Sequence, residues 1–106
     1  MSIELNLATF ADREQETFYL TANDVQLEMK LVEVTQIKLP KPRKWGTPQP
    51  VFREEPFSLV FQGPTEPPLH QSIYPMRHGD MGELGGIFMV PIAADAQGRY
   101  YEAVFN

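Results

Sequence analysis

Phe57-Ser58-Leu59-Val60-Phe61 alternates large apolar side chains with other residues and runs into Gln62-Gly63-Pro64. Large apolar residues at every second position are typical of a β-strand, and Gly-Pro ends such a run with strong turn chemistry. The alternation directs Phe57, Leu59 and Phe61 to one face, while Val60 adds apolar character to the other. We therefore expect a central strand here, in a mostly β protein.

The size and composition of the chain indicate one globular domain that spans residues 1–106. A chain of 106 residues can bury a core without help from a metal or a disulfide. The 10 Pro and 7 Gly residues indicate many turns rather than long helices. The absence of cysteine excludes disulfides, thiolate nucleophiles and Cys-based metal sites.

The charge of the chain argues against nucleic acid as a partner. The formal net charge is −5 and the pI is about 4.9, so the summed field repels phosphate backbones. The N-terminus lacks a basic segment followed by an apolar one, and no apolar run is long enough to span a membrane. We expect a cytoplasmic protein, although export without a signal or assembly into a particle would leave the same sequence features.

The first third of the chain predicts a short helix and a β-hairpin. Thr9 and Asp12 resemble a loose capping box for one or two helical turns. Residues 17–21 alternate as a strand, and residues 22–24 contain Asn and Asp, which tolerate a tight turn. The second arm begins at Val25, and its apolar phase slips near Leu31-Val32, which predicts a β-bulge.

Residues 39–50 contain four prolines and predict a loop, because proline completes neither a helix nor a sheet ladder. The clustered positive charge of the chain lies here, at Lys41, Arg43 and Lys44, beside the only tryptophan, Trp45. A proline-stiffened loop with an aromatic side chain loses little entropy on docking, so these four residues are candidates for binding a protein partner. The alternative is that Trp45 folds back onto the domain.

The remaining sequence predicts three more strands. Residues 69–77 form a strand weakened by Pro75, which suits an edge position. Residues 83–92 contain Gly85-Gly86, which indicates a bulge, and residues 100–105 pair most simply with residues 87–92. The fold class is thus a small antiparallel β-sandwich or partly open β-barrel of about six strands, with a short N-terminal helical turn. We expect most of the core to be Phe57, Leu59, Phe61, Ile87, Val104 and Phe105.

Several segments along nearly the whole chain carry a family resemblance. They are Thr9-Phe10-Ala11, Leu31-Val32-Glu33-Val34, Phe57 to Pro64, Leu69-His70-Gln71, Met81-Gly82-Glu83-Leu84, Met89-Val90-Pro91-Ile92 and Tyr101 to Asn106. Together they resemble DUF6916, a family of short bacterial proteins of unknown function. The resemblance implies a link to phage-tail-collar or microcystin-dependent-type proteins, and hence to tail-like or fibrous assemblies, and it assigns no catalytic residues.

One polar cluster is a candidate metal or acid–base site: His70, His78, Asp80 and Glu83. Imidazole and carboxylate suit zinc or manganese, but the same spacing is common in solvated hairpin turns. The glycine-rich turns match neither phosphate-binding nor dinucleotide-binding motifs, so no cofactor is implied. The acidic pairs that include Glu14 and Glu16 are interpreted as solvated surface.

These observations favour a non-enzymatic structural or protein-interaction module, in line with the tail-like or fibre-like assembly that the resemblance implies. The first alternative is a metal-assisted hydrolase that uses the His/Asp/Glu cluster, and the second is a small-ligand-binding barrel. Apolar residues on both faces of the central strand predict self-association, with a homodimer as the expected state.

Overall fold

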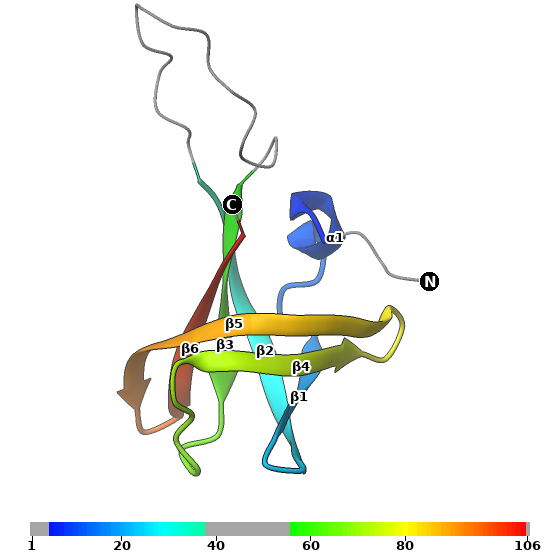
Figure 1. Ribbon diagram of the computed structural model, residues 1–106. Helices are drawn as coiled ribbons and strands as arrows, with labels where there is room; N and C mark the ends of the chain where they lie inside the picture. The colour runs from blue at the N-terminus through cyan, green and yellow to red at the C-terminus, as the bar shows by residue number, and fades with distance from the viewer. Residues whose placement is uncertain (1–4, 38–55, 106) are drawn as a thin grey trace, which may run out of the picture.

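Six antiparallel strands close into a barrel, and a short helix lies against one end of it (Figure 1). The computed structural model describes residues 5–37 and 56–105. The elements are α1 (Leu7–Ala11), β1 (Thr17–Ala22), β2 (Val25–Gln36), β3 (Phe57–Gly63), β4 (Ser72–His78), β5 (Gly82–Asp95) and β6 (Gly98–Phe105). The order around the barrel is β1-β2-β3-β6-β5-β4, with β4 paired back to β1. The expected mostly β class is confirmed, and the barrel is closed.

The predicted central strand is confirmed as β3. It pairs with β2 on one side and with β6 on the other, and Phe57, Leu59 and Phe61 are buried in the barrel. Val60 lies on the outer face, where it is half-buried. The alternation therefore lines the interior with the three large side chains.

The predicted hairpin is also confirmed. Asn23 and Asp24 join β1 to β2 with φ angles of 50° and 64°, the left-handed backbone that a two-residue turn between twisted strands requires. The register of β2 against β3 shifts between Leu31 and Glu33, so the expected bulge lies at Val32. Because the bulge adds one residue to β2, Leu31 and Val34 both lie on the inner side of the strand, although they are three positions apart.

The helix begins earlier than its expected cap. Asn6, rather than Thr9, caps α1, and the two side chains form a reciprocal capping box in which Asn6 accepts from the Thr9 amide. The Thr9–Asp12 prediction was wrong because Asp12 follows the last helical residue. The helix buries Phe10, whose ring lies 5.8–6.0 Å from the rings of Phe18, Phe57 and Phe105. The Phe10 side chain thus covers the core at this end of the barrel.

β4 and β5 cross in front of β2, β3 and β6 in Figure 1. β4 is not the edge strand that Pro75 suggested, because it pairs with β5 and also with β1. The proline is tolerated because the pairing with β1 ends at Met76, one residue away. The expected bulge of β5 is confirmed beside Gly85, where Leu84 is the extra residue between two paired positions. β6 pairs with Val90 to Asp95 of β5, later along that strand than predicted.

The core contains four of the six expected residues as buried side chains and a fifth, Phe105, packed against it. Val104 is 46% exposed, so its assignment to the core was wrong. Neighbouring residues of a strand point to opposite faces, and Phe105 takes the inner side by stacking on Phe57 at 4.7 Å. The remaining buried hydrophobic side chains come from α1, from five of the six strands and from the segment before β4: Phe10, Phe18, Leu20, Met29, Leu31, Leu69, Met76, Leu84, Met89, Tyr101 and Ala103.

Candidate functional site

The basic loop predicted as a binding segment lies outside the described residues. Lys41, Arg43, Lys44 and Trp45 all fall within residues 38–55. Their proposed role therefore rests on the sequence.

The four candidate metal ligands are not assembled into a metal site. Within residues 5–37 and 56–105, no group of three His, Asp or Glu side chains is placed to hold a metal ion. His70 is exposed ahead of β4, and its carbonyl accepts a hydrogen bond from the Tyr74 hydroxyl. Asp80 and Glu83 are exposed, whereas His78 is buried at the end of β4. The cluster is thus divided between the surface and the interior.

Both ring nitrogens of His78 are engaged in hydrogen bonds. Nδ1 lies 3.1 Å from the main-chain nitrogen of Asp80 and 3.3 Å from that of Met81, so it accepts from the turn between β4 and β5. An acceptor nitrogen carries no proton, so the proton of the neutral ring is on Nε2, which lies 2.6 Å from Glu16 Oε1. The Phe18 ring packs against the imidazole at 4.7 Å. His78 therefore ties the turn to the segment that precedes β1.

Glu16 is the member of this hydrogen-bond network that the sequence did not single out. Its carboxylate accepts from His78 and from Arg13 Nη1, 3.2 Å away, and the Arg13 guanidinium lies 4.0 Å from Asp80. Partial desolvation of the Glu16 carboxyl raises its pKa, but hydrogen bonds from Arg13 and His78 and the charge of Arg13 outweigh this, so the pKa is lowered. Glu16 and His78 are far apart in the sequence, so no spacing rule pairs them.

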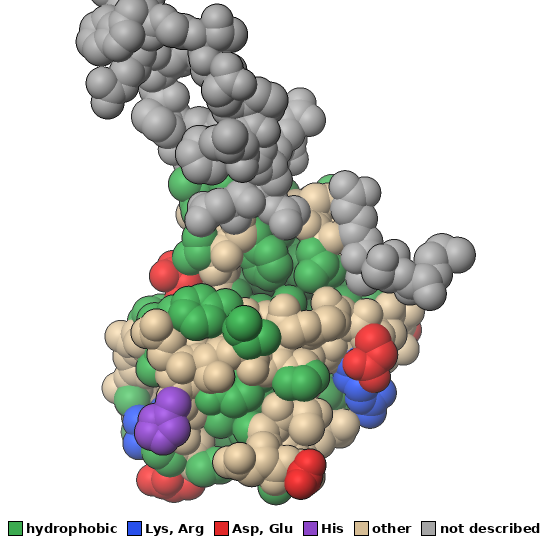
Figure 2. All heavy atoms as spheres, in the orientation of Figure 1, with side chains coloured by type: hydrophobic (Ala, Val, Ile, Leu, Met, Phe, Trp, Pro, Cys, Tyr) green, Lys and Arg blue, Asp and Glu red, His purple; other side chains and the backbone are tan. Residues whose placement is uncertain are grey.

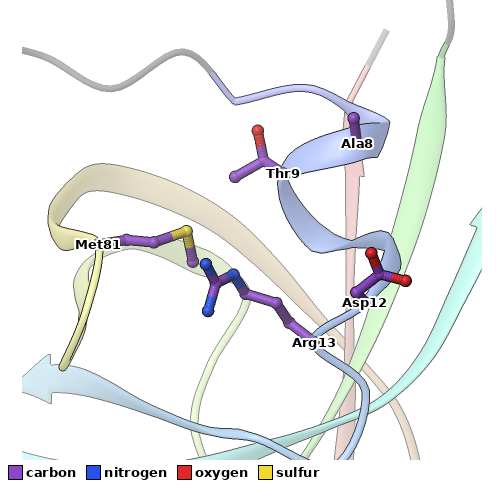
Figure 3. A pocket seen from close by; sticks show the side chains of 5 residues that line it. All are labelled: Ala8, Thr9, Asp12, Arg13 and Met81. Atoms are coloured by element: carbon purple, nitrogen blue, oxygen red, sulfur yellow. The ribbon is translucent and has the colours of Figure 1, made fainter.

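A hollow of about 460 Å³ lies beside this network, between α1 and the β4–β5 turn. Its lining comprises Ala8, Thr9, Asp12, Arg13 and Met81, and Figure 3 shows the Arg13 and Met81 side chains extending toward each other across it. The Thr9 hydroxyl is hydrogen-bonded to Asn6 Oδ1, so it is not poised as a nucleophile. The lining and the neighbouring His78 thus provide a structural network rather than a nucleophile–base pair.

The outer face of β4 and β5 carries a second candidate site, which is apolar. Ile73 and Phe88 are directly opposed across the two strands and are 65% and 46% exposed. The Ile73 side chain lies across Gly86, where an added Cβ would come within 2.7 Å of its Cγ2 atom. Figure 2 shows hydrophobic side chains gathered on the face that β4 and β5 present to the viewer. The sequence placed both residues in strands, but the apolar run of β5 did not show which of its residues face outward.

Comparison with known proteins identifies the family of this chain. A family model described as a domain of unknown function, DUF6916, matches residues 5–105. The chain belongs to the DUF6916 family. No curated protein and no solved structure gives a significant match. The DUF6916 assignment therefore supplies no activity, and among the described residues no helix is long and apolar enough to cross a membrane.

Proposed function

We propose that this DUF6916 protein is a non-enzymatic interaction module that associates with a second copy of itself through the Ile73–Phe88 face. The exposed, directly opposed apolar pair is the observation that carries the proposal. An exposed aromatic beside an exposed β-branched residue leaves apolar area in water, and burying it on association is favourable. A two-fold axis at this face would set Ile73 of each copy against Phe88 of the other.

The charge distribution along the chain favours a second copy as the partner. Of the nine Lys and Arg residues, five lie within residues 38–55: Lys38, Lys41, Arg43, Lys44 and Arg53. Most Asp and Glu residues lie instead in the barrel segments. One chain therefore carries both members of a complementary pair, so the basic segment with Trp45 would steer toward the acidic barrel of another copy.

The alternatives have less support. A metal-assisted hydrolase would need His70, His78, Asp80 and Glu83 together, but His78 uses both ring nitrogens within the fold. A ligand-binding barrel would need open space in its interior. The fully buried side chains of Phe18, Phe61 and Tyr101 lie there instead. A place in a tail-like or fibre-like assembly is what the family resemblance implies for such an interaction module, and a repeated position beside tail-protein genes would support it.

The test is the mass of the protein in solution at micromolar concentration. Sedimentation equilibrium should give twice the 12.1 kDa of one chain. Phe88→Thr and Ile73→Thr should each raise the dissociation constant at least tenfold, which corresponds to roughly 1.4 kcal/mol at an interface aromatic or its partner. The matched control is Val25→Thr, which changes a residue that is 54% exposed on the β1–β2 hairpin. A single-chain mass for the wild type, or equal weakening by the control, would contradict the proposal.

A further inference from the structure

The hydrogen bonds of His78 leave one ring nitrogen that can take up a second proton. Nε2 already donates to Glu16, and Nδ1 accepts from the amides of Asp80 and Met81. The lowered pKa of Glu16 keeps its carboxylate ionised while a histidine titrates, so Nε2 retains its proton. Any proton that His78 gains must therefore go to Nδ1.

A proton on Nδ1 is incompatible with the present turn. A protonated Nδ1 is a donor, and it then faces two main-chain N–H groups that are also donors. Both hydrogen bonds are lost together, because they share one acceptor atom. The imidazolium itself remains held, since its Nε2–H faces the Glu16 carboxylate at 2.6 Å. The ring thus stays in place while the turn loses its two hydrogen bonds to the ring.

We propose that the β4–β5 turn is a proton-operated latch, in which protonation of His78 at Nδ1 releases the amides of Asp80 and Met81. Met81 lines the hollow beside α1, so release of the turn changes one wall of that hollow. Glu16, from the segment before β1, is paired with His78, and Arg13 from the same segment contacts both Glu16 and Asp80 of the turn. On the β1 side the ring meets the uncharged Phe18.

The surrounding contacts favour movement of the β4–β5 turn over movement of the segment that contains Glu16. The Glu16 side is anchored to β2 by two main-chain hydrogen bonds, from Gln15 to the Leu31 carbonyl at 2.6 Å and from Leu31 to the Glu16 carbonyl at 3.1 Å. Gly79 and Asp80, by contrast, are exposed. The anchored carboxylate holds the imidazolium, and the exposed turn moves.

Nuclear magnetic resonance of the full chain between about pH 8 and pH 5 tests the latch, because histidines ordinarily titrate in this range. The ¹⁵N signals of the His78 ring should show the neutral ring protonated on Nε2 at high pH. As the ring becomes doubly protonated, the Asp80 and Met81 amide signals should shift with the same midpoint and their hydrogen exchange should accelerate. Exposed His70 is an internal reference: changes in its own ring signals should not be accompanied by changes in these two amides.

A variant distinguishes proton uptake by the His78 ring from proton uptake by the charged groups near it. His78→Asn keeps a side-chain acceptor near the position of Nδ1 but cannot gain a proton, so its Asp80 and Met81 amides should become independent of pH in this range. The latch is wrong if His78 of the wild type gains its proton while both amides stay unchanged. It is also wrong if His78 gains no proton before the protein unfolds, or if the amides of a folded His78→Asn variant still titrate.

Discussion

Replacing Leu59 by Ala probes the packing on which the barrel depends. Leu59 is 1% exposed and lies on β3 between Val34 of β2 and Ala103 of β6. The change removes three buried carbons, worth about 2.4 kcal/mol at roughly 0.8 kcal/mol for each. The cavity left in a close-packed interior raises the expected loss of unfolding free energy to about 3–5 kcal/mol.

Urea denaturation at one fixed protein concentration measures this loss, and the slope of the unfolding free energy against urea should stay unchanged. The matched control is Val104→Ala, which removes two carbons from a side chain that is 46% exposed. Its expected cost is only about 0.8 kcal/mol, half of that for two fully buried carbons. A loss below about 1 kcal/mol for Leu59→Ala, or equal losses for both variants, would refute the assignment of their faces.

Three further changes test the helix and the His78 network. Phe10→Ala should lower the unfolding free energy by about 3–5 kcal/mol, because the ring is fully buried among three other aromatic rings, and urea denaturation should show it. Asn6→Ala should cost about 1 kcal/mol through loss of the cap, measured against Asp12→Ala as a control beyond the helix. Glu16→Gln should make the unfolding free energy less dependent on pH in the acid range. The lowered pKa of Glu16 stabilises the fold at pH values above the ordinary pKa of 4.5, and this stabilisation is lost as the pH falls through the pKa of the folded state. An unchanged dependence of the unfolding free energy on pH would count against the network.

Local sequence patterns predicted much of the fold. The alternation at Phe57, Leu59 and Phe61 located β3 because a strand with one buried face repeats every two residues. Asn23-Asp24 located the first turn because few residues adopt its backbone without strain. The bulge at Val32 was predicted because the apolar phase itself slips there.

Features that depend on distant residues were not predictable in the same way. Closure of the barrel rests on β1 meeting β4, and no local pattern identifies that pairing. Glu16 resembled an ordinary surface acid, because its partner His78 lies at the far end of another strand. The short apolar run Val104-Phe105 gave two candidates for one inward position, and the stacking of Phe105 on Phe57 decides between them.

The most direct test of the proposed self-association is to detect contacts between copies in the unaltered protein. In a mixture of ¹³C-labelled and unlabelled chains, isotope-filtered nuclear Overhauser spectra report only contacts between different molecules. The predicted result is a set of cross-peaks between the Ile73 methyl groups of one copy and the Phe88 ring of the other. An absence of intermolecular cross-peaks at these two residues, or their appearance at Val25 instead, would contradict the proposed interface.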